Sequence, residues 1–202
     1  MAGADDDADI IRRKTAGARH DRFNVVCIPP LVILSLWSLA RPSQIVHYAL
    51  SWSVLVYVVM DTVYHLIVPH CQPGPVRTTT IVLHHIIVVL LAYHVLSEPK
   101  HLHFTAWATV VEVNTLCQVM FKAFKVKIFQ IGFLASWFVL RLIWYPYLIY
   151  MFHTVLVGED SRAYWQVVGS QTILVFLNFF WTAEFLLSGG KGKKDSGKDK
   201  TT

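Results

Sequence analysis

IFQIGFLASWFVLRLIWYPYLIYMFHTVLV, residues 128–157, is a run of 30 residues in which Arg141 is the only Asp, Glu, Lys or Arg. A helix needs about 20 mostly apolar residues to cross the hydrocarbon core of a bilayer. The stretch therefore predicts a transmembrane helix that is longer than one straight crossing requires. Pro146 lies inside it, and a proline removes a backbone hydrogen bond and clashes with the preceding turn. We therefore predict a kink near Pro146.

Similar apolar stretches recur along the whole chain, and short segments with proline, glycine or charged residues separate them. Only 15% of the 202 residues are charged, whereas about a quarter are charged in a typical soluble domain. We therefore predict an all-α, polytopic membrane protein with six transmembrane helices. The predicted spans are Phe23–Ala40, Ile45–Val68, Thr78–Leu96, His103–Phe121, Ile128–Val157 and Tyr164–Leu187.

The six spans form one predicted membrane domain, residues 23–187, between two polar ends. Residues 1–22 carry several aspartates and no apolar core, so we interpret them as a cytosolic segment and not as a signal peptide. Residues 188–202 are rich in Gly, Lys, Asp and Ser, a composition that predicts a disordered cytosolic tail. Pro29 and Pro30 lie in the first span, which could cross the bilayer fully or turn back as a hairpin.

The distribution of basic residues predicts the orientation of the chain. Six spans put both termini on one side, where fourteen lysines and arginines fall, and the other side holds Arg41, Lys100 and Arg162. This bias predicts that both termini are cytosolic. The net charge of +5 follows from this topology and does not indicate nucleic-acid binding, for which no sequence module is found.

The last five residues, 198–202, read KDKTT and fit the K-x-K-x-x pattern of di-lysine retrieval signals. Receptors read such signals on cytosolic tails. Lys198 and Lys200 therefore predict residence in the endoplasmic reticulum and recognition by coat proteins. A lysine-rich tail could instead bind anionic lipid.

Histidines and an aspartate lie inside predicted spans, where each ionisable group costs a few kcal/mol at the bilayer centre. Asp61 and His65 are four residues apart and share a helix face. His84 and His85 are adjacent, so one can face a cavity while the other orients it or contacts a neighbouring helix. The Asp61–His65 pair and the His84–His85 pair could each take part in a functional site, or each could form hydrogen bonds that only stabilise helix packing. Four further histidines lie near predicted helix ends and are expected to be solvated: His94, His101, His103 and His153.

Glu112 and Arg141 fall near the middle of the fourth and fifth predicted spans. Arginine does not readily lose its proton, so Arg141 is expected to meet an anion, either Glu112, Asp61 or a lipid head group. The structural alternative is an ion pair with Glu112 that only fixes helix packing. Thr109 and Thr115 share the face of Glu112, and Tyr145 shares that of Arg141. Asn114 and Asn178 are expected to make contacts between helices.

These residues resemble the signature of the TLC-domain family, to which the ceramide synthases belong. The resemblance rests on Asp61, on LHH at residues 83–85, on EVNT at residues 112–115 about 28 residues later, and on Arg141. It covers roughly residues 48–187, and the chain is most similar to the small TLC-domain proteins. The resemblance implies helices around a polar-lined lipid cavity.

The resemblance to ceramide synthases implies transfer of a fatty acyl group from acyl-CoA to a lipid amine. His84 or His85 would act as general base, Glu112 would orient the histidine or hold its charge, and Arg141 would meet phosphate or carboxylate. Asp61, His65, Tyr145, Thr109 and Thr115 would complete the substrate site. The family signature has a second aspartate where this chain has Thr115, which cannot ionise.

Two functions remain open on the sequence alone. One is a non-catalytic lipid sensor, lipid chaperone or cargo receptor that affects sphingolipid or phospholipid homeostasis, which Thr115 favours. The other is a lipid N-acyltransferase with acyl-CoA as co-substrate, which the histidine pair favours. We expect no bound cofactor and no metal site in either case.

Overall fold

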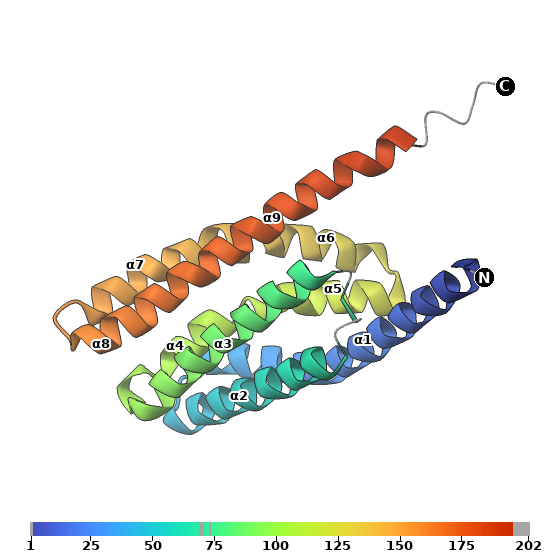
Figure 1. Cartoon of the computed structure of the whole chain (residues 1–202). Helices are drawn as coiled ribbons and strands as arrows, with labels where there is room; N and C mark the ends of the chain where they lie inside the picture. The colour runs from blue at the N-terminus through green and yellow to red at the C-terminus, as the bar shows by residue number, and fades with distance from the viewer. Residues whose placement is uncertain (1, 69–70, 73, 196–202) are drawn as a thin grey trace.

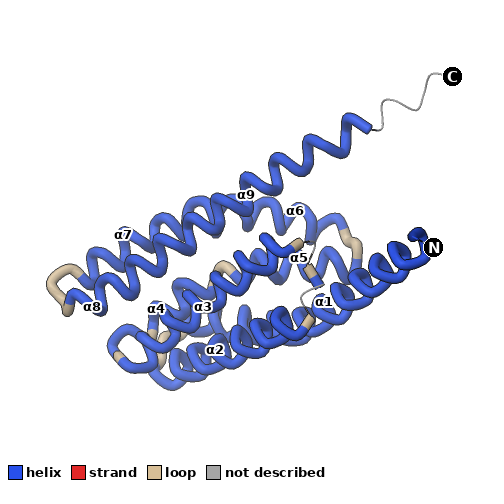
Figure 2. The backbone as a smooth tube through the Cα atoms, viewed as in Figure 1, coloured by secondary structure: helices blue, strands red, loops and turns tan. Residues whose placement is uncertain are grey.

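The computed structural model describes residues 2–68, 71, 72 and 74–195, and these residues form only helices and connecting turns (Figures 1 and 2). This confirms the predicted all-α fold. The α-helices are α1 (Ala2–Ala40), α2 (Gln44–Ile67), α3 (Pro75–Ser97), α4 (His103–Thr109), α5 (Glu112–Phe124), α6 (Lys127–Ser136), α7 (Tyr145–Leu156), α8 (Ser161–Tyr164) and α9 (Ser170–Asp195). The 3₁₀-helix η2 (Pro99–His101) and the π-helices η3 (Trp137–Trp144) and η4 (Trp165–Gly169) link some of them.

Within the described residues, five helical stretches are long and apolar enough to cross a membrane. They are Ile10–Ala40, Gln44–Ile67, Pro75–Ser97, Lys127–Leu156 and Ser161–Leu187. Five of the six predicted spans are thereby found as continuous helical stretches. Large apolar side chains on their outer surfaces are exposed, for example Ile45, Trp165 and Phe176, as expected for helices that face lipid.

The first predicted span belongs to a much longer helix. α1 is unbroken from Ala2 to Ala40 and passes through Pro29 and Pro30 without turning back, so the first span is not a hairpin. The neighbouring side chains Ile28 and Leu31 are buried, and tertiary packing of this kind supplies most of the stability of a helix in a protein. The predicted boundary at residue 22 is not a structural break.

The fourth predicted span is not one helix. α4 and α5 are separated at Val110 and Val111, which keep right-handed helical backbone angles but lie in a tighter stretch where N–H groups donate to carbonyls three residues earlier. The prediction of one regular α-helix from His103 to Phe121 is therefore wrong, and six membrane-spanning helices are not confirmed. Glu112 follows this irregular stretch directly.

The helix that contains Arg141 widens just before Pro146. η3 follows α6 directly, and the backbone N–H of Tyr145 donates to the carbonyl oxygen of Leu140, five residues earlier. Pro146 has no N–H to donate, and its ring excludes the carbonyl group four residues before it. Short π-helical segments often occur at functional sites, and here the segment carries Arg141.

The chain runs back and forth along one bundle, and α1 begins at the end of the bundle where α9 ends (Figure 1). We call this the first end of the bundle and the other the far end. One apolar core joins α3, α4, α7, η4 and α9, and its fully buried members include Leu148 and Leu156. A second core, around Leu50, joins α1, α2 and α4. Between the cores the helices surround the polar residues described below.

Candidate functional site

A cavity of about 250 Å³ lies inside the bundle. Its lining comes from α1, α2, α3, α4, α5, η3, α7, η4 and α9, so residues distant in sequence meet there. All nine residues that the sequence suggested as a site line it: Asp61, His65, His84, His85, Thr109, Glu112, Thr115, Arg141 and Tyr145. The structure thus brings the nine together, while their chemical roles stay predictions.

The cavity changes from polar to apolar along the bundle. α3 lines it with Arg77, His84 and His85 in its first half and with apolar residues from Val88 to Val95 in its second half. The same order holds in α1 and, in reverse, in α2, which runs the opposite way (Figure 2). The polar part therefore lies toward the first end of the bundle and the apolar part toward the far end.

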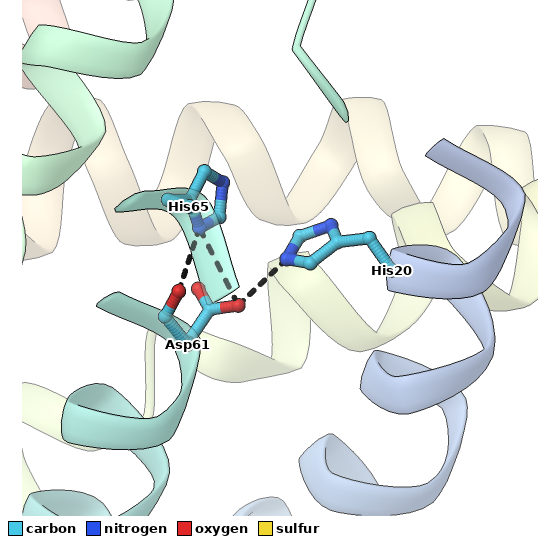
Figure 3. A group of neighbouring side chains, drawn as sticks. All are labelled: His20, Asp61 and His65. Atoms are coloured by element: carbon cyan, nitrogen blue, oxygen red, sulfur yellow. Dashed lines mark hydrogen bonds and ion pairs between the residues drawn. The ribbon is translucent and has the colours of Figure 1, made fainter. Parts of the chain in front are cut away.

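Asp61 is the centre of a buried cluster of histidines (Figure 3). One carboxylate oxygen, Oδ1, lies 2.6 Å from Nε2 of His20 and 3.7 Å from Nδ1 of His65. The other oxygen, Oδ2, lies 3.3 Å from Nε2 of His85. All four side chains are buried. A carboxylate in such a place can fix the tautomer of a histidine and stabilise its cation.

The two adjacent histidines of α3 have different surroundings. His85 is held on both sides, by Asp61 and by the hydroxyl of Thr62, which lies 3.0 Å from Nδ1. His84 also lines the cavity and lies against the ring of Trp181. Its Nδ1 is buried without a hydrogen-bond partner among the described residues. Of these two histidines, His84 is therefore the one that can still form a hydrogen bond with a ligand.

Arg141 is held by neutral oxygen atoms. Its guanidinium group donates to Oδ1 of Asn114 at 2.9 Å, to Oδ1 of Asn178 at 2.8 Å and to Oγ1 of Thr115 at 3.2 Å. The group also lies over the ring of Trp137. Among the described residues it forms no ion pair within 4 Å, so the direct contact expected with Glu112 or Asp61 is not found. The side chain is buried, and Glu112 acts on its charge only from beyond Thr115, so the direct contacts of the guanidinium group carry no negative charge.

Glu112 and Tyr145 complete the polar wall beside Arg141. Both line the cavity, and the hydroxyl of Tyr145 donates to the backbone oxygen of Ala108 at 3.3 Å, close to the turn between α4 and α5. Thr115, which replaces the second acidic residue of the ceramide-synthase signature, is a neutral acceptor for Arg141. An ionised side chain at that position would cancel the charge that the neutral partners preserve.

A family model described as the TLC domain matches residues 23–187. The chain belongs to the TLC-domain family. No curated protein and no solved structure matches the chain. The match covers all six predicted spans of this membrane protein. It includes in full seven of the nine helices that carry the cavity's lining residues, since α1 begins before it and α9 ends after it.

His20 of this TLC domain's cavity region escaped the sequence analysis. It lies just before the matched range and was placed in a cytosolic segment, but it contacts Asp61 from α1. Asn114 and Asn178 make the expected contacts between helices, and the partner that the sequence did not identify for them is Arg141. His20 is four residues before Asn24, and the two side chains contact each other at 3.4 Å. That spacing was the only signal in the sequence that could have pointed to His20.

The polar part of the TLC-domain cavity continues toward the first end of the bundle. A second hollow of about 520 Å³ shares Arg77, Lys122 and Trp137 with it. Ion pairs join the helices there: Nη1 of Arg77 lies 2.7 Å from Oε2 of Glu184, and Nζ of Lys122 lies 2.8 Å from Oδ1 of Asp21. The cavity and the second hollow therefore adjoin at a rim of paired basic and acidic side chains.

Two histidines near the far end of the TLC domain are not solvated, contrary to expectation. His94 and His101 are both buried, and Nε2 of His94 lies 3.0 Å from Nδ1 of His101. Their rings stack, and His101 stacks in turn on Phe104. The fold of η2 back onto α3 brings the pair together, and this contact cannot be read from the spacing of the two residues.

Proposed function

We propose that this TLC-domain protein resides in the endoplasmic reticulum, binds a membrane lipid in its cavity and thereby affects the lipid composition of the membrane. The observation that carries the proposal is Arg141, a buried cation in the cavity wall whose hydrogen-bond partners are neutral. Hydrogen bonds between an arginine and a phosphate or carboxylate are among the strong ones in proteins. The lipid head group would therefore carry one of these anions.

The shape of the cavity suits an amphiphilic ligand. Arg141, Glu112 and His84 belong to its polar part, and the apolar part beyond them is lined by residues such as Leu91 and Phe152. Small-molecule sites usually enclose roughly 300–1,000 Å³, and about 250 Å³ is less than that range. The cavity would therefore enclose the head group and the first part of a chain, and the rest would extend between the helices.

The location and orientation rest on independent features. The excess of lysines and arginines on one side favours cytosolic termini, and α1 begins where α9 ends, as that topology requires (Figure 1). The di-lysine pattern at Lys198 and Lys200 lies outside the described residues. Under this topology the polar part of the cavity would lie toward the cytosol.

We expect Ala108→Phe to lower the amount of co-purifying lipid at least about 5-fold. Ala108 lines the cavity, and a phenyl ring there would occupy space that the lipid needs. The measurement is mass spectrometry of lipids extracted from the protein after purification in detergent. Ala135→Phe is the matched control, because Ala135 is exposed on α6 and the added ring faces outward. Size-exclusion chromatography checks that the wild type and both variants are folded. Equal amounts of lipid in these three folded proteins would contradict the proposal.

Acyl transfer is the second candidate, and the unpartnered nitrogen of His84 favours it. A general base must reach the proton that it removes, and among the two adjacent histidines only His84 has a ring nitrogen without a hydrogen-bond partner. His85 and Asp61 would then act beside it as an orienting pair. The acyl group would pass from the thioester of acyl-CoA to the nitrogen of a lipid amine. The C–S bond would break, an amide bond would form, and coenzyme A would leave as the thiol with the proton that His84 took from the amine.

If this second candidate is correct, His84→Ala should lower acyl transfer at least about 100-fold, the size of a typical general-base contribution. Labelled acyl-CoA is offered with several lipid amines, and products are separated by chromatography. His153→Ala is the control, since His153 is exposed and lies outside the cavity. If neither the wild type nor the variants form product but all still bind lipid, catalysis is rejected and the proposal of lipid binding stands.

A further inference from the structure

We propose that Asp61, His20, His65 and His85 form a site for a divalent transition-metal ion, with Zn²⁺ as the best fit. One ligand atom each from His20, Asp61 and His65 lies within 4.8 Å of the other two. His85 approaches the second oxygen of the same carboxylate at 3.3 Å. Three imidazoles therefore surround one carboxylate in a buried place, as Figure 3 shows for two of them.

Each histidine of the cluster has one nitrogen toward Asp61 and the other on an uncharged polar side chain. The outer nitrogen of His20 contacts the amide of Asn24 at 3.4 Å. The outer nitrogen of His65 contacts Gln72 at 3.0 Å, and that of His85 contacts Thr62 at 3.0 Å. Metal-binding histidines almost always donate the N–H of the second nitrogen to an acceptor, which sets the tautomer and the orientation of the ring. The hydroxyl of Thr62 can accept from His85, whereas the amides of Asn24 and Gln72 face His20 and His65 with their nitrogens and must turn over to present their oxygens.

The distances between the histidine nitrogens and the carboxylate of Asp61 are near those of a tetrahedral site, and small side-chain movements are needed to complete it. Zn²⁺ binds histidine nitrogen at about 2.0–2.1 Å, so neighbouring ligand atoms lie about 3.3 Å apart. Nε2 of His20 and Nε2 of His85 lie 2.6 and 3.3 Å from oxygens of Asp61. Nδ1 of His65 is 3.7 Å from the carboxylate but also 2.8 Å from the backbone oxygen of Asp61. His65 must therefore rotate away from that oxygen to bind, and His85, which lies outside the group of atoms within 4.8 Å of one another, must move toward His20 and His65.

The donor set decides the kind of ion and its effect. Imidazole suits zinc, whereas calcium and magnesium prefer oxygen ligands. Four protein ligands fill a tetrahedral site, as in structural zinc sites, and leave no position for substrate. The ion would join α1, α2 and α3, because His20, Asp61 with His65, and His85 belong to these helices in that order. His84 would remain free for the lipid, so this inference does not depend on the proposed function.

The test uses the full-length protein in detergent, stripped of metal with a chelator and then supplied with ZnCl₂. We expect about one zinc per chain after desalting, measured by mass spectrometry of the metal, and a rise of about 5 °C or more in Tm at saturating zinc. His20→Gln and His85→Gln should each weaken zinc binding at least about 10-fold, and Asn24→Ala should weaken it by a smaller factor. Cobalt(II) added in place of zinc should show the visible absorption of a tetrahedral site.

The control variant is His94→Gln, which alters the buried histidine pair with His101 near the far end of the bundle. Its zinc affinity should equal that of the wild type. Failure of the folded wild type to bind stoichiometric zinc, or unchanged affinity in His20→Gln, would overturn the assignment. If the variants do not fold, X-ray absorption of the zinc-loaded wild type decides. Three imidazoles and one oxygen are expected there, and sulfur ligands or fewer than two imidazoles contradict the site.

Discussion

Asp61→Ala is expected to lower the free energy of unfolding by about 3–5 kcal/mol, the usual cost of removing one partner from a buried charged network. Asp61 is 4% exposed and accepts from, or pairs with, histidines on three helices. Without the carboxylate, Nε2 of His20 and Nε2 of His85 would lose their partner. The measurement is thermal and SDS-induced unfolding in mild detergent without added metal.

Asp21→Ala provides the comparison for Asp61→Ala. Asp21 also pairs with a basic group, Lys122, at 2.8 Å, but that contact is exposed. Exposed ion pairs contribute only about 0–1 kcal/mol, so this variant should unfold close to the wild type. If Asp61→Ala lowers the free energy of unfolding no more than Asp21→Ala does, the histidine cluster does not hold α1, α2 and α3 together.

Arg141→Gln is expected to weaken the binding of lipids with phosphate or carboxylate head groups about 10- to 100-fold while the protein stays folded. A hydrogen bond to a charged group contributes about 1.5–3 kcal/mol, which corresponds to that range. The glutamine amide can still donate to Asn114 or Asn178, which now accept from Arg141. Because Arg141 forms no ion pair within 4 Å among the described residues, its removal breaks no direct ion pair, and Tm should fall less than in Asp61→Ala.

Lipid-overlay or nanodisc titrations with phosphatidic acid, phosphatidylserine and uncharged diacylglycerol measure this effect. Only the anionic lipids should lose affinity. Arg162→Gln is the control, because Arg162 is exposed in α8 and does not line the cavity. A large fall in Tm with no change in lipid selectivity would indicate that Arg141 serves packing alone.

Several features of this protein could be deduced from the sequence. The 30-residue run around Arg141 and four other apolar stretches predict membrane-spanning helices, because crossing a bilayer requires a local property, a long enough apolar segment. Asp61 and His65 could be placed on one helix face for the same reason, since helical periodicity is local. The high cost of ionisable groups in a bilayer also made Glu112, His84 and His85 candidates for the cavity wall.

Contacts between helices were decided by the tertiary structure. His20 lies 41 residues before Asp61 in a segment that looks like a polar end, and only the packing of a long α1 against α2 brings the two together. The neutral partners of Arg141 come from α5 and α9 and depend on the same kind of packing. A pattern along the chain shows which residues are costly to bury. Which side chains then satisfy their charges and hydrogen bonds depends on the helices that surround them.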